Sequence, residues 1–565
     1  MNDLTTRLLD AVSGDEMWRH LERLVELDRT SGTQGERDAV DYVVRTLEAY
    51  GLPVTVHEYQ AYLSYPEHGA LTVRTDDGTR EIRAKTRAFS ANTPAAGAQG
   101  LLVSIKGGTN MFKADDAVNQ ISPASVGGKI VLSESGSRGS MLAAQAAGAL
   151  AYIHMWPSDE DVIHEGIVTP VWGTPTPESA DRLPAIPIIS IRHDDGVALR
   201  AELERGPVEA TVHSTTRTGW STVRMPVTDI PGSSAEFVLV AGHIDSWHYG
   251  ATDNATGNVA CLEIARVLHE HRAELRRGAR IAWWVGHSTG RYSGSTWYAD
   301  HHWHELDERC VAYVNIDSPG ALGATDYGLV SAVPDTAAVV SSSVQAVTGQ
   351  VPEIERPLRA GDQSFWGVGI ASLYMLLSSR PEGQRAAVGG CGMGWWWHAE
   401  EDLLDKADKA VLVADTKIYL HSVARLMNDE VLPLDVSAQI DEVRGFVEAL
   451  QPLAADRLDL TPVTDALGEL EEAFGQTSTM HTARRNDAIR VVNHRLTAVS
   501  FTFADRFDHD PAFPLPPLPS LDVVRQLARL DPHSDAFGFL QTRLVRSRNA
   551  VVYHLKEATQ ACRTT

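Results

Sequence analysis

Histidine and aspartate residues follow an apolar stretch of the sequence in a spacing that suits metal binding. The stretch Val238–Asp253 opens with an apolar run, continues as G-H-I-D at residues 242–245, and ends at Asp253 just before a helical pattern. A strand that ends in His and Asp, followed by an Asp at the next helix start, is how α/β proteins build metal sites. Taken alone, the same residues are equally compatible with a polar loop that contains a chance histidine.

Later segments of the chain add side chains of the same chemical kinds, namely His287 with Ser288, Asp317 and His398. Neutral imidazoles and carboxylates together form a mixed nitrogen and oxygen ligand set for Zn²⁺, Mn²⁺ or another divalent first-row ion. A bridging carboxylate can hold two such ions about 3.5–4 Å apart, where they polarise a carbonyl and activate a water molecule. The pattern therefore favours metal-assisted hydrolysis. For His398, which follows three tryptophans, the alternative is a buried core histidine.

Strands and helices alternate after residue 215, and this order predicts how the candidate ligands are positioned. Strand patterns lie at 237–241, 279–285 and 311–316, and helical patterns lie at 255–270 and 295–308. Such alternation is typical of α/β folds with parallel strands and helices on both faces of the sheet. The histidines and aspartates would then follow successive strand ends.

The remaining segments differ in pattern. Residues 14–50 have helical spacing with a break at 31–33, and strand-like alternation follows at 54–59 and 71–75. Beyond about residue 430 long helical patterns predominate, at 440–450, 488–501 and 534–558, and a proline-rich connector at 511–519 interrupts them. We therefore expect a mainly helical C-terminal domain.

Length, charge and cysteine usage limit the class of protein. A chain of 565 residues is too long for one core, so three or four domains are expected. The net charge of −24 argues against nucleic acid and anionic membranes as partners. No apolar run reaches about 18 residues, and the first residues lack a signal-peptide pattern. Four scattered cysteines without C-x-x-C spacing suit a reduced protein, so we expect a cytoplasmic one.

Four ordered motifs carry a resemblance to a known family. The series G-H-x-D-S-W…G-x-x-D-N, W-W-x-G…G-S-T-W, V-A-Y-V-N-x-D-S and W-W-H-x-x-x-D resembles the M28 metallopeptidases, within them the glutamate carboxypeptidase II and transferrin-receptor branch. The resemblance implies a zinc-peptidase-like α/β domain (residues 1–90 and 216–430) with a mostly parallel mixed sheet flanked by helices. It also implies an inserted β-rich protease-associated (PA) domain (91–215), whose glycine–lysine strand and alanine-rich helix are visible in the sequence. The helical region (431–565) resembles that branch's dimerisation domain, which implies a homodimer.

The resemblance also implies metal ligands and a cofactor. His243 and Asp317 would bind one ion together with the bridging Asp253, and His398 and Asp253 would bind a second. Asp245 would orient His243, and Asp402 would orient His398. The cofactor would be one or two divalent ions, with Zn²⁺ expected, and the substrate a small or peptide-like molecule.

The chain departs from the family at two adjacent positions. The family carries two glutamates after W-W-x-G, a general base and a metal ligand, where this chain has His287 and Ser288. A serine hydroxyl is a poor ligand for a divalent ion, so one tightly held ion, or a second ion bound weakly, is favoured over a full pair. His287 could act as the base or as a ligand, although one nitrogen cannot do both.

Arg291 lies in the same turn, where the family has a leucine. A guanidinium near a metal site favours a carboxylate or phosphate on the substrate, and the alternative is a pair with a nearby aspartate. We expect residues 362–365 and the aromatic segment 392–397 to line the pocket. The candidate catalytic residues are therefore His287, Asp245, Arg291 and Ser288.

Three functions are compatible with these features. The first is a metal-dependent hydrolase of the aminopeptidase or carboxypeptidase type with an altered base, which cleaves an amide bond in a peptide-like or N-acylated substrate. The second is a metal enzyme of this fold with a non-peptidase reaction, and the third is a non-catalytic binding protein like the transferrin receptor. The retained set of histidines and aspartates argues against the third, because mutually repelling acids have no structural reason to cluster without a cation.

Overall fold

A twelve-stranded sheet runs through the computed structural model, which describes residues 3–108, 116–158, 160–374 and 376–563. Its strands are β1 (Val54–Thr75), β2 (Gly78–Arg83), β3 (Lys85–Thr86), β4 (Ala98–Ile105), β5 (Ile130–Ser133), β6 (Ala151–Met155), β7 (Ile188–Ile191), β8 (Glu209–Ile230), β9 (Phe237–His243), β10 (Gly278–Trp284), β11 (Cys310–Asn315) and β14 (Ser372–Leu373). The strand order is β14-β11-β9-β10-β8-β4-β5-β6-β7-β3, and β1 pairs with both β8 and β2. The mixed sheet and its flanking helices confirm the predicted α/β class.

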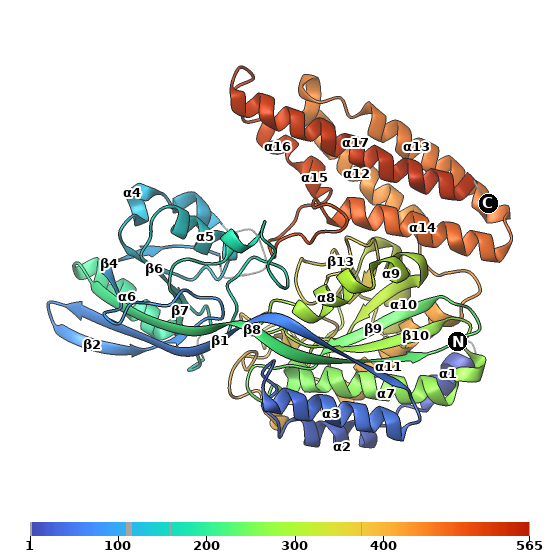
Figure 1. Cartoon of the computed structure of the whole chain (residues 1–565), viewed down its shortest axis with the longest axis horizontal. Coiled ribbons are helices and arrows are strands. Elements are labelled where there is room, and N and C mark those ends of the chain that lie inside the picture. Colours follow the sequence, from blue (N-terminus) through green and yellow to red (C-terminus); the bar gives the residue numbers. More distant parts are fainter. Residues whose placement is uncertain (1–2, 109–115, 159, 375, 564–565) are drawn as a thin grey trace.

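The α/β domain is built on the parallel strands β10, β9, β11 and β14. Every residue of β9, β10 and β11 is buried, as expected for parallel strands that are covered on both faces. Figure 1 shows helices on one face, α2 (Gly14–Leu24), α3 (Gln34–Ala49), α7 (Thr256–Glu270) and α11 (Lys409–Asn428), and on the other face α8 (Ser293–His301) and α9 (Trp303–Arg309). The single helix predicted over 295–308 is divided, because His302 leaves helical dihedral angles. Peripheral elements are α1 (Asp3–Asp10), α10 (Ala337–Thr348), β12 (Leu329–Ser331) and β13 (Glu353–Glu355).

The long antiparallel strands β1 and β8 join the two halves of the sheet. Each has 22 residues, and together they pair continuously from Val54 with Thr228 to Arg74 with Glu209, apart from an irregularity between Pro66 and His68. The two short strands predicted at 54–59 and 71–75 are therefore parts of one strand. The continuous ladder ties the inserted segment firmly to the α/β domain.

The inserted module has its own parallel strands, β4, β5, β6 and β7, and the helices α4 (Pro123–Val126), α5 (Arg138–Ala146) and α6 (His193–Arg205). Its core includes Leu71, Val73 and Ile82, which precede residue 91, together with residues of β5 and β6. The glycine–lysine strand and the alanine-rich helix expected in this region are present as β5 and α5. The assignment as a PA domain and the domain bounds stay predictions.

The C-terminal residues form a helical layer beside α9 and α10 (Figure 1). Its helices are α12 (Val436–Ala454), α13 (Thr461–Gln476), α14 (Thr482–Phe501), α15 (Pro519–Asp522), α16 (Val524–Leu527) and α17 (Asp535–Arg563). The predicted helical character of this region is confirmed, and the proline-rich connector between α14 and α15 is irregular. Among the described residues, no helix is both long enough and apolar enough to cross a bilayer.

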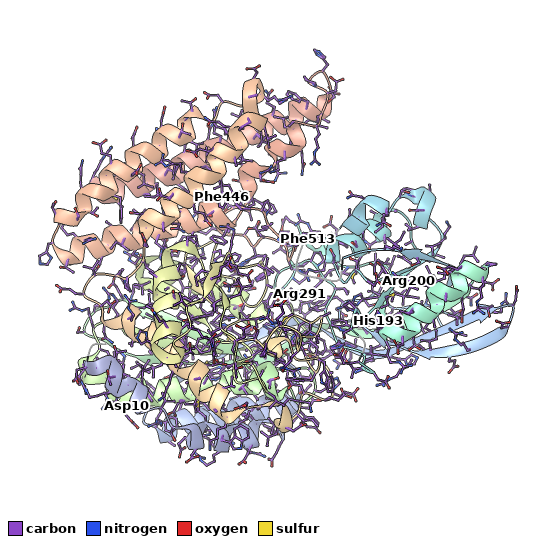
Figure 2. All side chains as sticks on the ribbon, turned by 180° about the vertical axis from the view of Figure 1, so that it is seen from behind. Asp10, His193, Arg200, Arg291, Phe446 and Phe513 are labelled. Carbon is purple, nitrogen blue, oxygen red and sulfur yellow. The ribbon has the colours of Figure 1, made fainter. Side chains whose placement is uncertain are left out.

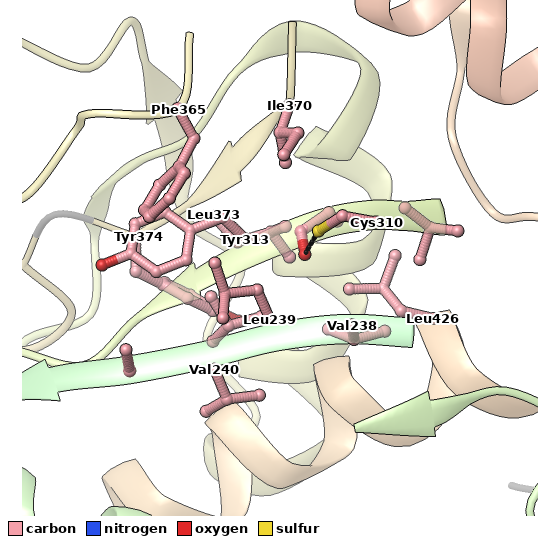
Figure 3. Packing of buried hydrophobic residues seen from close by; sticks show 14 of the residues in the cluster. Val238, Leu239, Val240, Cys310, Tyr313, Phe365, Ile370, Leu373, Tyr374 and Leu426 are labelled. Carbon is pink, nitrogen blue, oxygen red and sulfur yellow. Dashed lines mark hydrogen bonds between the residues drawn. The ribbon is translucent and has the colours of Figure 1, made fainter. Parts of the chain in front are cut away.

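Packing around β9 shows why the strand end that bears His243 is rigid. Figure 3 shows Leu239 and Val240 on opposite faces of β9, and Tyr313 and Leu373 come from the neighbouring parallel strands. These four side chains are fully buried. Full burial of such a side chain stabilises a fold by about 1.5–3 kcal/mol. The strand end that bears His243 therefore continues from a fully buried part of the sheet.

Candidate metal centre

The predicted ligands lie at the carboxyl edge of the parallel strands. They are His243 at the end of β9, Asp253 in the turn before α7, His287 after β10, Asp317 after β11, and His398 in the loop before α11. Parallel strands end at one edge of a sheet, so residues distant in sequence meet there. The structure brings all five into one cluster, and their role as ligands stays a prediction.

Asp253 lies between two of the histidines. Its Oδ1 atom is 3.0 Å from Nε2 of His243, and its Oδ2 atom is 3.2 Å from Nε2 of His398. Asp317 Oδ1 lies 3.6 Å from the same Nε2 atom of His243. One carboxylate oxygen of Asp253 therefore faces each histidine, which is the arrangement of a bridging ligand.

The other ring nitrogen of both histidines is hydrogen-bonded to a backbone carbonyl. His243 Nδ1 lies 2.9 Å from the carbonyl oxygen of Asp245, and His398 Nδ1 lies 3.1 Å from that of Glu165. A carbonyl oxygen only accepts, so each Nδ1 carries the hydrogen and each neutral ring keeps its lone pair on Nε2. Both lone pairs face the carboxylate of Asp253.

The charge balance of this cluster calls for a cation. Nε2 of His243 is buried and makes no hydrogen bond within the part of the chain that the structure describes. Burial alone would lower the pKa of His243, but Asp317 and the neighbouring aspartates outweigh burial and raise it well above its ordinary value. Burial likewise opposes ionisation of Asp253, yet its contacts with the two histidines hold its pKa well below the ordinary range. Buried lone pairs and carboxylates that face one another fit a divalent cation.

His287 belongs to this cluster through both its position and its partner. Ligand atoms of His243, His287 and Asp317 all lie within 4.8 Å of one another. Nδ1 of His287 is 2.7 Å from Oδ2 of Asp362, whose other oxygen accepts a hydrogen bond from Ser295. The His287 ring stacks on the His243 ring at 3.8 Å between centroids, with 13° between the planes. Asp362 thus holds Nδ1–H, and Nε2 is left as the basic nitrogen.

Asp245 holds the turn that presents His287 and Ser288. Its carboxylate accepts the backbone N–H groups of both residues, at 3.2 and 2.8 Å, and the hydroxyl of Ser31 at 2.8 Å. Asp245 therefore contacts His243 mainly through its backbone carbonyl. Gly286 begins this turn with φ +70°, and a Cβ there would lie 2.0 Å from Ser293 Oγ. Only glycine fits that position without strain.

The expectation that Asp402 orients His398 is wrong. The Asp402 carboxylate instead accepts the backbone N–H groups of Thr252 and Asp253, at about 2.9–3.1 Å, and the Thr252 hydroxyl at 2.8 Å. Burial raises the pKa of Asp402 to about 7, against the opposing effect of these hydrogen bonds. Asp402 thus positions the backbone that carries Asp253. The group that orients His398 is instead the backbone carbonyl of Glu165.

Three buried arginines line the same cavity, Arg87 and Arg138 from the inserted module and Arg291 from the α/β domain. Within the residues that the structure describes, none of the three forms an ion pair with a carboxylate. Arg291 instead donates to the carbonyls of Thr169 and Ile167. Burial and the charge of Arg291 lower the pKa of Arg87 to about 10 and that of Arg138 to about 9. The cavity therefore combines a cation site with an excess of guanidinium charge.

The cavity has a volume of about 80 Å³ and lies where the module meets the α/β domain. Figure 2 shows Arg291 in this central position, between the module and the helical layer. Asp253, Ser288 and Asp317 line the cavity, as does Trp397 from the aromatic segment expected there. At the other expected segment, 362–365, the lining residues are the preceding Ala360 and Gly361. The lining places four of the candidate ligands, Asp253, His287, Asp317 and His398, around the same cavity as the arginines.

Sequence reasoning did not find Arg87, Arg138 or Glu165. Each stands in the inserted module, far along the chain from the metal motifs, and no spacing pattern marks it. The link between His287 and Asp362 was also missed, although residues 362–365 were expected in the pocket. Only the docking of distant segments brings these groups to the site.

Comparison with known proteins finds a family match over part of the chain and similar proteins. Residues 227–423 match the model of peptidase family M28. The chain is 25% identical to a probable glutamate carboxypeptidase from Arabidopsis thaliana, over 88% of this chain and 81% of that protein. It is also 25% identical to a probable glutamate carboxypeptidase from Zea mays, over 75% of this chain and 68% of that protein. The fold is similar to that of a zinc aminopeptidase from Bacillus subtilis, with a TM-score of 0.55, 20% identity, and coverage of 74% of this chain and 96% of that one. The match to peptidase family M28 thus covers residues 227–423, the part of the α/β domain that carries the candidate ligands.

Proposed function

We propose that the protein is a metal-dependent hydrolase of the M28 peptidase type that cleaves an amide bond in a small, carboxylate-bearing, peptide-like substrate. One observation carries the proposal: candidate metal ligands line the same cavity as three arginines that have no carboxylate partner among the described residues. The family supports peptide hydrolysis, and two relatives are named as probable glutamate carboxypeptidases. N-acylated amino acids are further candidates, because they have the same amide and carboxylate.

The expected metal is Zn²⁺, for which imidazole nitrogen and carboxylate oxygen are preferred ligands. His243, Asp317 and Asp253 would hold one ion, and His398 with Asp253 would hold another more weakly because Ser288 brings no charge. When bound, such an ion polarises the amide carbonyl and makes a water molecule more acidic. Similarity to a zinc aminopeptidase supports this choice of metal.

His287 is the group best placed to accept the proton of the attacking water. The lone pair of an imidazole nitrogen lies in the plane of its ring, and the rings of His287 and His243 are nearly parallel. Their Nε2 lone pairs therefore lie in two nearly parallel, separate planes and do not converge on one ion. His287 Nε2 is left to take the proton, while Nδ1–H stays hydrogen-bonded to Asp362.

The arginines would bind the carboxylate of the substrate. Guanidinium groups form charge-assisted, often bidentate hydrogen bonds with carboxylates. An incoming carboxylate would also relieve the mutual repulsion of Arg87, Arg138 and Arg291. This pairing would orient the scissile amide between the arginines and the metal cluster.

Hydrolysis of a panel of dipeptides and N-acyl amino acids by Zn²⁺-loaded protein tests this function. Each substrate should be compared with its C-terminal amide, which lacks the carboxylate. We expect cleavage that chelation abolishes and that falls for the amides. A metal-loaded protein that hydrolyses none of the panel would contradict the proposal.

A second candidate, a non-peptidase metal enzyme, is favoured by one observation, the replacement of the family's two glutamates by His287 and Ser288. The double variant His287→Glu/Ser288→Glu separates the two candidates. Peptide cleavage that appears only in this variant would support the second. A protein that never binds metal would instead support a receptor-like binding role. A homodimer formed through the helical layer and a cytoplasmic location remain proposals.

A further inference from the structure

The inserted module contacts a candidate metal ligand directly at Glu165. The backbone N–H of Glu165 donates to the carbonyl of His398 at 2.8 Å, and Nδ1 of His398 donates to the carbonyl of Glu165 at 3.1 Å. The preceding His164 is hydrogen-bonded through Nδ1 to the carbonyl of Trp397. Residues 164–165 therefore pair with residues 397–398 over two successive positions, and one of these bonds sets the tautomer of His398.

The Glu165 side chain contacts a second loop of the metal centre. Its carboxylate is buried and lies 2.9 Å from Nζ of Lys85 and 3.2 Å from Nε2 of His248. His248 stands in the loop that joins His243 to Asp253, with φ +53°. Lys85 lies on β3 and also pairs with Glu400, two residues after His398. Charged contacts of this kind, when desolvated, hold their partners in a defined geometry.

Glu165 thus contacts both segments that supply the second candidate metal site, namely the loop of His398 and the loop that leads to Asp253. Its backbone holds the His398 ring, and its carboxylate holds the loop that carries Asp253. His398 itself has φ +58°, a backbone conformation that non-glycine residues adopt only when neighbouring contacts stabilise it. Aromatic packing adds to the contact, because His164 stacks on Trp156, and Trp397 packs against the same Trp156.

We infer that Glu165 of the inserted module is a positioning residue for the metal held by His398 and Asp253, so that occupancy of that half-site depends on docking of the module. The inference rests on the proposed metal-dependent function. It assigns to the module a role in building the metal centre, in addition to lining the cavity. Partners that orient a metal-binding histidine typically contribute 10- to 100-fold to metal affinity.

A double-mutant cycle on metal binding tests the inference without an activity assay. Zn²⁺ affinity and stoichiometry should be measured, by competition with a chromophoric chelator and by elemental analysis, for wild type, Glu165→Ala, His398→Ala and the double variant. Glu165→Ala keeps the backbone carbonyl that accepts from His398 but removes the carboxylate that holds the loop of Asp253. We expect it to weaken Zn²⁺ binding by about 10-fold or more and to have a smaller effect when His398 is already Ala. Additive losses would show that Glu165 acts on general structure and would overturn the inference.

Two further variants control for folding. Glu134→Ala removes a carboxylate that pairs with Arg200 elsewhere in the module and should leave Zn²⁺ binding unchanged. Lys85→Met keeps Glu165 but removes its ammonium partner, and it should weaken Zn²⁺ binding at the same half-site. Unchanged binding in both Glu165→Ala and Lys85→Met, with a wild type that binds Zn²⁺, would overturn this inference alone. A wild type without Zn²⁺ affinity would overturn the proposed function as well.

Discussion

Nε2 of His243 and Nε2 of His398 face opposite oxygens of Asp253, at 3.0 and 3.2 Å. No other described carboxylate contacts both rings at such distances. Asp253 is therefore the one side chain on which both halves of the cluster depend. The backbone N–H of Asp253 donates to the carboxylate of Asp402, so Asp402 helps to position the candidate bridging ligand.

Substitution Asp253→Ala should abolish Zn²⁺ binding and hydrolysis together, because it removes a ligand from both halves of the cluster. Elemental analysis after dialysis measures the first effect, and the peptide panel measures the second. Asp300→Ala, which removes an aspartate paired with His509 outside the cluster, is the matched control. Zn²⁺ that is retained in Asp253→Ala would show that Asp253 is not a ligand of the metal site.

Substitution His287→Ala should lower kcat by about 10²–10⁴-fold with Zn²⁺ content retained, because general-base catalysis contributes that much. Asp362→Asn should lower kcat less, since the proton acceptor remains but loses its preferred tautomer. Elemental analysis and steady-state kinetics give the two readings. Loss of Zn²⁺ in His287→Ala would show instead that His287 is a ligand, and His301→Ala serves as a control at an exposed histidine.

Arg138→Gln and Arg291→Gln should raise KM for substrates with a free carboxylate. A hydrogen bond to a charged group contributes about 1.5–3 kcal/mol, which corresponds to roughly 10- to 150-fold in affinity. The same variants should change KM little for C-terminal amides. Equal effects on both substrate types would contradict a carboxylate-binding role. Arg200→Gln, in the module but outside the cavity, is the control.

The free energy of unfolding should decrease as the pH rises, because Asp335 is buried in its protonated form. Burial, with Glu442 and Asp435 nearby, raises the pKa of Asp335 from 3.8 to about 8. Its carboxyl group accepts a hydrogen bond from Asn493 of α14. The folded protein thus keeps a proton that the unfolded chain loses, so its contribution is complete below about pH 4 and is lost as the pH rises to about 8. The slope approaches 1.4 kcal/mol per pH unit.

Urea unfolding of wild type and Asp335→Asn between pH 5 and 9 measures this effect. The variant stays neutral, so the difference in free energy of unfolding should increasingly favour it up to about pH 8 and then level off. Asp456→Asn, at an exposed position, controls for the loss of one charge. A difference that is independent of pH would contradict the assigned protonation of Asp335.

Much of the fold could be predicted because the relevant signals are local. The apolar runs of β9, β10 and β11 and the helical spacing of α3 and α7 determine those elements through burial and periodicity. The middle of β1 was less predictable than its ends, since it carries polar and proline residues that only pairing with β8 keeps extended. Propensity is a weak guide where long-range pairing decides.

By itself, the sequence determined which residues can bind a metal, since His243, Asp253, Asp317 and His398 follow strand and loop ends in an ordered series. Only the tertiary structure decided what holds and surrounds them. The contact of Glu165 with His398, the pairing of His287 with Asp362, and the convergence of Arg87, Arg138 and Arg291 all join segments far apart in the chain. These contacts depend on how loops of the α/β domain and of the module meet in space, and no local pattern of residues encodes contacts between segments so far apart.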